Sequence, residues 1–319
     1  MPRKEWRLLA RDLSFYATGR SDCAAADWAR DNWLYPLDWG YQLDRPDDYF
    51  TPFDSDGLPM REIPGAIPKT YLPSRIAAYA LANWNRLDRD ATARARFLNC
   101  ADWFAVQPGG AFRHDFPLVG MDAGWLSCIA QGEAMSVLVR AYRLTTEARF
   151  AEASRAAAVW LHRPVGDGGV LDHLSDGHMF VEEYPGSPYR HVLNGCLYAL
   201  TGLSDQVRAG LDEDGADAGL LNAVLDSISV HLDRWVVAGW TTYDYQSDDQ
   251  RAAGVPGNPN TLTYQMLHWI LLDHLGRMHE RPKLVDAAAQ WRRNAGSLPR
   301  RIGALVNKLR YRLHHGYRT

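Results

Sequence analysis

The feature that most restricts the fold of this chain is a series of amphipathic segments whose apolar residues recur at helical spacing. They cover about residues 74–84, 90–104, 127–144, 147–161, 189–208, 217–235, 261–275 and 283–293. Short and long connections alternate between them, which predicts about four helical hairpins. We therefore expect a mainly α fold, an incomplete α/α toroid with short β-strands in the long loops. In such a fold the long connections gather at one end and build the site.

Two shorter stretches have the residue pattern of strands. Residues 111–116 alternate between polar and apolar, and residues 239–245 are β-prone, with Thr241, Tyr243 and Tyr245 expected on one face. The segment 127–144 is apolar on nearly all sides, which predicts a buried helix of the inner ring. Within it, Arg140 is expected to hold a carboxylate or carbonyl group of a neighbouring helix.

The chain is predicted to have three parts. Residues 1–68 are dense in Pro, Gly and Asp and indicate an arm of loops and short elements packed on the main domain. Residues 69–295 hold the helical hairpins and form the catalytic α/α-barrel domain. Residues 296–319 form a basic tail helix, with no acidic residue after Asp286. The basic residues of the tail indicate one of two roles. The tail contacts a membrane surface or another anion, or it packs on the domain as a solvated helix.

Composition narrows the partners and the compartment. A net charge of -3 over 319 residues gives no general attraction to nucleic acid. No apolar run has the length of a signal peptide core or a membrane span, so a cytoplasmic protein is expected. The four cysteines are scattered and are expected to be buried thiols. The 12 tryptophans and 15 tyrosines suit sugar rings, although they can also simply fill a large core.

The densest group of acid–base side chains is Glu182-Glu183-Tyr184, which is followed by two prolines. Pro185 disfavours the helical region for Tyr184, and Pro188 blocks a helix again until about residue 189. The three side chains are therefore expected on irregular backbone at the mouth of a helix. Catalytic residues on a rigid scaffold often lie in such places.

Several motifs together resemble the C-terminal domain of D-glucuronyl C5-epimerases. They are Gly124-Trp125, Ala130-Gln131-Gly132, Leu138 to Tyr142, Glu182 to Pro185 with Val192 to Gly195, and Tyr243-Asp244 after a Trp-Thr-Thr run. The resemblance covers about residues 53–275. It implies an incomplete α/α barrel that acts on hexuronic acid residues of a heparosan-like polysaccharide. Two positions depart from the family pattern, because Gln246 stands at its arginine and Asn258 at a further catalytic tyrosine.

Epimerisation at C5 of a uronic acid requires a group that neutralises the carboxylate, a base on one face and an acid on the other. With the resemblance in view, we expect Tyr184 and Tyr243 to be the proton-transfer pair and Glu183 to assist them. The expected substrate-binding residues are Trp125, Gln131, Glu182, Arg190, His191, Asn194 and Gln246. A replacement for the family arginine is expected among Arg190, His191 and Arg251.

Other functions stay open at this point. The same C5 carbanion leads to a polysaccharide lyase if the C4 substituent leaves. Glu182 or Glu183 with Asp122 or Asp244 could make a glycoside hydrolase, and a uronate-polymer-binding relative without catalysis is a further interpretation. No cofactor and no metal are expected, since the Asp and His residues between 172 and 178 favour a solvated loop. The expected partner is an anionic polysaccharide or oligosaccharide, and a homodimer is a further interpretation.

Overall fold

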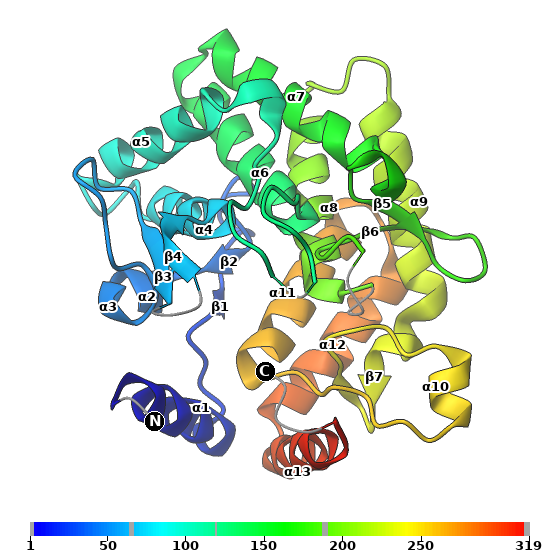
Figure 1. Ribbon diagram of the computed structural model, residues 1–319. Coiled ribbons are helices and arrows are strands. Elements are labelled where there is room, and N and C mark those ends of the chain that lie inside the picture. Colours follow the sequence, from blue (N-terminus) through cyan, green and yellow to red (C-terminus); the bar gives the residue numbers. More distant parts are fainter. Residues whose placement is uncertain (1–2, 64–66, 119, 187–190, 316–319) are drawn as a thin grey trace. The chain divides into compact units, whose positions relative to one another are not determined.

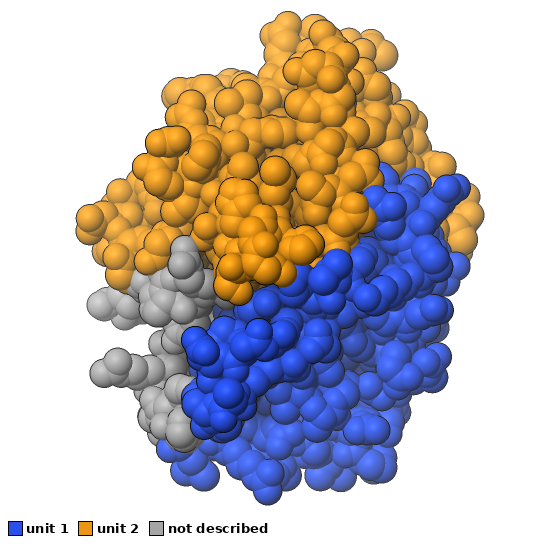
Figure 2. Space-filling model, turned by 90° about the vertical axis from the view of Figure 1, so that its right-hand side faces the viewer, with its two compact units in different colours: residues 1–24, 229–319 blue, residues 25–228 orange. Residues whose placement is uncertain are grey.

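The fold is mainly helical, with short two-stranded β-sheets between the helices (Figure 1). The computed structural model describes residues 3–63, 67–118, 120–186 and 191–315. The predicted mainly α class with short strands in the loops is confirmed. The chain forms two compact units, coloured separately in Figure 2: unit 1 comprises residues 1–24 and 229–319, and unit 2 comprises residues 25–228. Closure of the helices into a toroid and the boundaries at residues 68 and 295 stay predictions.

Unit 2 is built around one buried helix. Its longer helices are α4 (Pro73–Trp84), α5 (Ala93–Ala105), α6 (Cys128–Thr145), α7 (Ala148–His162) and α8 (Leu193–Arg208). α6 packs against the other four and is buried on all sides, as predicted for this segment. Its approach to α8 requires Gly132, because a Cβ atom there would lie 2.3 Å from the Cα atom of Ala199. α4, α6 and α8 therefore form the inner row of this unit.

The remaining elements of this part of the chain are short. They are α2 (Gly40–Leu43), α3 (Pro46–Tyr49), η1 (Pro108–Gly110), η2 (Val165–Asp167), β2 (Leu37–Asp38), β3 (Met60–Ile63), β4 (Ile67–Tyr71), β5 (Leu171–His173) and β6 (Met179–Val181). β3 pairs with β4 and β5 with β6, both antiparallel. β1 (Ala24–Ala25) precedes them, and α9 (Ala216–His231) follows α8.

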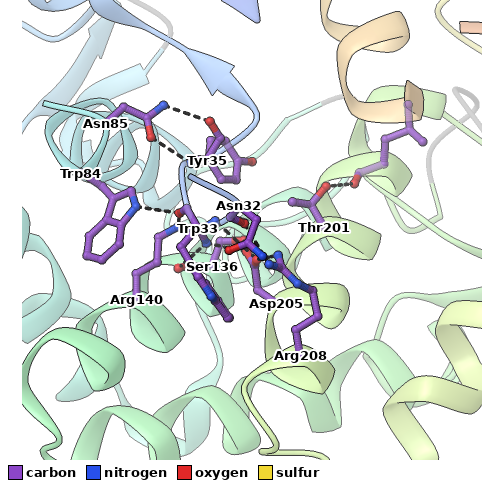
Figure 3. A network of polar contacts seen from close by, with 11 residues as sticks. Asn32, Trp33, Tyr35, Trp84, Asn85, Ser136, Arg140, Thr201, Asp205 and Arg208 are labelled. Atoms are coloured by element: carbon purple, nitrogen blue, oxygen red, sulfur yellow. Dashed lines mark hydrogen bonds and ion pairs between the residues drawn. The ribbon is translucent and has the colours of Figure 1, made fainter. Parts of the chain in front are cut away.

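A buried ion pair connects α6 to α8 (Figure 3). Nη1 of Arg140 lies 2.5 Å from Oδ2 of Asp205, and neither side chain is exposed to solvent. Ser136 also donates to Asp205, and the carbonyl of Trp33 accepts hydrogen bonds from Arg140 and Trp84. A buried guanidinium is tolerated only when its charge is paired and its donors are bonded. The structural role predicted for Arg140 is confirmed.

Unit 1 combines both ends of the chain. Its elements are α1 (Arg3–Thr18), η3 (Leu232–Trp235), β7 (Val236–Val237), β8 (Trp240–Thr241), α10 (Asp248–Ala252), α11 (Leu262–Met278), α12 (Pro282–Gly296) and α13 (Leu298–His315). α11 and α12 form a hairpin, and α13 packs on α12 and α1. Arg301 of α13 is buried and donates to the carbonyls of Tyr16 and Ala295. These bonds fix the terminal helix to the rest of the unit.

Two predicted strands are shorter than expected. The stretch 111–116 forms a single bridge, between His114 and Trp125, and the stretch 239–245 forms a strand only at Trp240 and Thr241. Tyr243 therefore lies in a bend after β8, and the predicted common face with Thr241 is wrong. The predicted helix start at residue 189 lies outside the described residues, and α8 is seen from Leu193. All four cysteines are free and buried, as predicted.

Candidate acid–base site

The carboxylate–phenol stretch follows a β-hairpin of unit 2. β5 and β6 pair with Leu171 opposite Val181. Beyond β6 the chain is held on both sides, because the Glu182 N–H donates to the Val170 carbonyl and the Glu182 carbonyl accepts from the Cys128 N–H. Cys128 is the first residue of α6. Backbone hydrogen bonds therefore place the stretch at the start of the buried helix.

Glu183 is buried against the first turn of α8. Its side chain is 6% exposed, and its Oε2 accepts a hydrogen bond of 3.0 Å from Nδ2 of Asn194. A Cβ atom at Gly195 would lie 2.6 Å from the Glu183 Cβ and 2.8 Å from its Oε2. Only glycine leaves room for the carboxyl group at this point. Asn194 thus positions Glu183, and its predicted contact with a sugar hydroxyl stays a prediction.

Tyr184 is half-buried beside aromatic side chains from the loop that precedes α6. Its ring centroid lies 5.8 Å from that of Trp125, which stacks on His114 at 3.9 Å. The Nε1–H of Trp125 donates to the Phe116 carbonyl at 2.9 Å and fixes the indole. Burial lowers the pKa of His114 to about 4, so this imidazole is neutral near pH 7. The phenol therefore lies against an uncharged aromatic wall of the kind that suits a sugar ring.

Glu182 is held by His191, which follows it closely in sequence. Its Oε1 lies 2.7 Å from Nδ1 of His191, and its Oε2 accepts the His191 N–H at 2.9 Å. Ligand atoms of Asp172, Glu182 and His191 all lie within 4.8 Å of one another, so these three side chains could hold a metal ion. An imidazole paired with a carboxylate accounts for the same arrangement. His191 is thereby positioned next to the Glu183–Tyr184 stretch.

A further buried carboxyl group in unit 2 is absent from the predicted site residues. Glu133 lies in α6 and is 2% exposed. Burial raises the pKa of Glu133 well above its ordinary value, and the charge of Glu183 raises it further. Burial therefore favours the neutral form of the Glu133 carboxyl group. A glutamate in a segment predicted to be buried on nearly all sides was the available signal, because burying a carboxyl group is costly.

One predicted substrate-binding residue is held entirely by the fold. Gln131 is fully buried: its Oε1 accepts from the Phe112 N–H, and its Nε2 donates to the carbonyls of Gly110 and Ala157. Both ends of the amide are bonded to backbone groups, and the predicted contact of Gln131 with the substrate stays a prediction. Arg190 lies outside the described residues.

The second predicted tyrosine lies in unit 1, after the β7–β8 hairpin. The turn residues Ala238 and Gly239 have φ angles of 51° and 80°, as a two-residue type I′ turn requires. The Tyr243 N–H donates to the Asn258 carbonyl at 2.9 Å, and the Tyr243 ring meets Tyr264 edge-on with centroids 5.8 Å apart. A backbone hydrogen bond thus joins Tyr243 to Asn258, and the loop that contains Asn258 lies next to Tyr243.

Gln246 of this unit stands at the position of the family arginine and Arg251 is an expected replacement for it, and neither supplies an unpaired positive charge. Gln246 is 7% exposed, and its backbone N–H donates to the Arg234 carbonyl. Arg251 donates to the carboxylate of Asp233 at 2.7 Å and to the carbonyl of the same residue at 2.6 Å. A neutral amide and a paired guanidinium leave the role of the carboxylate-binding cation unfilled by these two residues.

The fold and the contacts define a helical protein with a candidate acid–base site, in which carboxyl and phenol groups lie on loops at helix ends. The sequence pattern of the family described as D-glucuronyl C5-epimerase C-terminus matches residues 110–293. The chain belongs to this family, and the resemblance drawn from its motifs is confirmed. A D-glucuronyl C5-epimerase of Caenorhabditis elegans is 29% identical over 178 residues, which are 53% of this chain and 28% of that protein. The chain thus spans little more than a quarter of this relative, and α13 lies beyond the matched residues.

Proposed function

We propose that the chain is a hexuronic-acid C5-epimerase that acts on a glucuronate-containing polysaccharide. The observation that carries the proposal is the fixed Glu183–Tyr184 stretch, which joins a buried carboxylate to a phenol beside an aromatic wall. The family match and the name of the related protein support the reaction type.

In the proposed reaction a base removes the proton from C5, and the electron pair is delocalised into the adjacent carboxylate. An acid then returns a proton to C5 from the opposite face, so no other bond breaks. Tyr184 and Tyr243 carry out the two transfers, and Glu183 accepts or returns the proton at Tyr184. The free pKa of tyrosine is about 10, so a nearby cation is needed before its phenolate can act as a base.

Glu133 has a supporting role in this scheme. The substrate is an anion, and a second carboxylate next to Glu183 would repel it. Burial raises the pKa of Glu133 and so favours its neutral form, which carries no such charge. Its neutral carboxyl group can also donate a hydrogen bond, which an ionised glutamate cannot do.

The test is incubation of unsulfated and sulfated glucuronate polymers with the protein in heavy water. Deuterium at C5 with both epimers recovered supports the epimerase, whereas an unsaturated sugar at a new chain end indicates the lyase. New reducing ends without deuterium at C5 would indicate hydrolysis. If a folded protein binds the polymer and leaves C5 unlabelled, the chain is a binding relative and the proposed reaction is wrong.

We also propose that α13 lies on an anionic membrane surface. Five of its apolar residues are 42–84% exposed and recur at helical spacing, which places them on one face: Leu298, Ile302, Val306, Leu309 and Leu313. Arg310 and Arg312 are also exposed, and no acidic residue follows Asp286. An exposed apolar stripe with basic neighbours is typical of helices that lie in a membrane interface. Among the described helices none combines the length and apolarity needed to cross a bilayer. The predicted homodimer stays a prediction.

A further inference from the structure

Lys308 of α13 reaches the loop to which Tyr243 is bonded. Its Nζ donates to Oδ1 of Asn258 at 2.6 Å. The carbonyl of the same asparagine accepts the Tyr243 N–H at 2.9 Å. A side chain from the terminal helix, outside the residues that match the family, therefore becomes part of the surroundings of the predicted proton-transfer tyrosine.

Lys308 is half-buried, and its surroundings leave the charge of its ammonium group available for binding an anion. Burial lowers the pKa of Lys308 to about 8; Arg312 on the same helix lowers it too, and Asp244 raises it. Asp244 follows Tyr243 directly, so the ammonium is close enough to this segment to interact with it electrostatically. Asn258 is neutral and takes one of three N–H donors, which leaves the positive charge and further donors for an anion.

Three other basic residues of unit 1 are committed to contacts within the protein. Arg301 and Arg300 of α13 donate to backbone carbonyls, the latter to that of Ala238. Arg251 is paired with Asp233. Lys308 differs from them because its hydrogen-bond acceptor is a neutral side chain at a position next to Tyr243.

We propose that Lys308 binds the carboxylate of the hexuronate on which Tyr243 acts. This inference rests on the proposed epimerase function and adds the residue that holds the substrate at the Tyr243 segment. Negative charge grows on the uronate carboxylate as the C5 proton leaves, and a fixed ammonium there stabilises it. The sequence places the neutral Gln246 where the resembling family has an arginine, and Lys308 supplies a positive charge from a different element.

Three variants test this proposal: Lys308→Met, Lys308→Arg and the exposed control Arg310→Met. Deuterium incorporation at C5 of a glucuronate polymer gives kcat and KM for each variant. We expect Lys308→Met to reduce kcat/KM by about tenfold to a hundredfold, the usual loss for a hydrogen bond to a charged group. Lys308→Arg should keep most of the activity, and Arg310→Met should match the unsubstituted protein.

The pH profile separates substrate binding from a purely structural bond to Asn258. With lysine, activity should fall as pH rises through about 8 because the ammonium loses its proton there. With arginine this fall should move to higher pH, since a guanidinium stays protonated. If both substitutions lower the melting temperature and leave the pH profile unchanged, Lys308 only attaches α13 to the loop and the proposal is wrong.

A binding measurement keeps the two proposals distinguishable. Titration calorimetry compares a glucuronate oligosaccharide with its carboxyl-reduced counterpart. The unsubstituted protein should prefer the carboxylate form, and Lys308→Met should lose most of this preference. Absence of C5 exchange with this preference intact would refute the epimerase reaction alone, whereas equal preference in both proteins would refute the role of Lys308.

Discussion

The two tyrosine segments are held in different ways. Around Tyr184, a strand pair and the start of α6 fix the backbone, the first turn of α8 holds the Glu183 side chain, and Gly195 leaves room only for the Glu183 carboxyl group. Tyr243 follows a strand of two residues and is bonded to the loop at Asn258, which Lys308 reaches from α13. The first segment is determined by helices within the family-matched residues. The Tyr243 segment is also contacted by Lys308, which lies outside the family-matched residues. This segment is therefore the place where the chain can differ most from its relatives.

The largest expected effect comes from removing each phenol oxygen. Tyr184→Phe and Tyr243→Phe should each reduce kcat by about a hundredfold to ten-thousandfold, the usual contribution of a general acid or base. KM should change little, because the rings remain. Rates of C5 deuterium incorporation measure both constants. If only Tyr184→Phe is inactive, the Tyr243 segment binds substrate without transferring protons, and full activity of both variants would refute the tyrosine assignment.

Two glycines give a matched test of how rigid the segments are. A methyl group at Gly195 would meet the Glu183 Cβ at 2.6 Å, whereas one at Gly257 would meet the flexible end of Gln246 at 2.5 Å. Gly195→Ala should therefore lower the free energy of unfolding by about 1–3 kcal/mol and reduce activity, as overpacking does. Gly257→Ala should cost less than Gly195→Ala, since the methyl group would meet only the outer ends of two side chains, those of Gln246 and of Val237 at 2.9 Å. Thermal unfolding of both variants measures this, and equal losses would contradict the difference in rigidity.

The long helices could be predicted from the sequence because apolar spacing over several turns is a strong signal. The segment predicted at 127–144 is α6, from Cys128 to Thr145. The β5–β6 hairpin was not predicted, since strands of three residues are too short for a periodic pattern. β8 is shorter still, and for that reason the predicted register of Tyr243 failed.

The sequence predicts the candidate site only where neighbouring residues restrict the backbone conformation. Pro185 alone indicates irregular backbone at Tyr184, and the structure agrees. Residue type cannot tell whether the fold already uses a side chain, and this explains why Gln131 was expected to bind sugar. The contact from Lys308 to Asn258 joins residues 50 positions apart, so no local pattern announces it.

A smaller effect is expected at Glu133, and it concerns stability. Because its pKa is raised in the folded state, the folded protein keeps a proton that the unfolded chain releases above about pH 4.3. Stability should therefore fall as pH rises above that value, by up to about 1.4 kcal/mol per pH unit. Glu133→Gln removes this loss, so its advantage in melting temperature should grow between about pH 5 and pH 8.

Glu152→Gln on the exposed face of α7 is the control for Glu133, and it should show no such trend. A Glu133→Gln protein that gains nothing with rising pH would mean that Glu133 is ionised in the fold. The proposed supporting role of a neutral Glu133 beside Glu183 would then be wrong.

The smallest expected effect on catalysis comes from the exposed stripe of α13. Ile302→Asp with Leu309→Asp should abolish sedimentation with vesicles that contain phosphatidylserine, because charges enter the apolar face. Val230→Asp, at an apolar residue of α9 that is 55% exposed, is the control and should still sediment. Turnover of a dissolved oligosaccharide should stay unchanged, since Lys308 lies off the stripe, one helical turn after the buried Ala304.

Two outcomes would break this last prediction. Sedimentation that survives the double substitution would exclude the stripe as the membrane contact. Loss of a dimer in light scattering, with no vesicle binding by the unsubstituted protein, would show that a second copy covers the stripe. If turnover of the dissolved substrate also falls, α13 has moved and carried Lys308 away from Asn258. The Tyr243 segment would then depend on the terminal helix for its position as well as for its charge, while the Tyr184 segment would not.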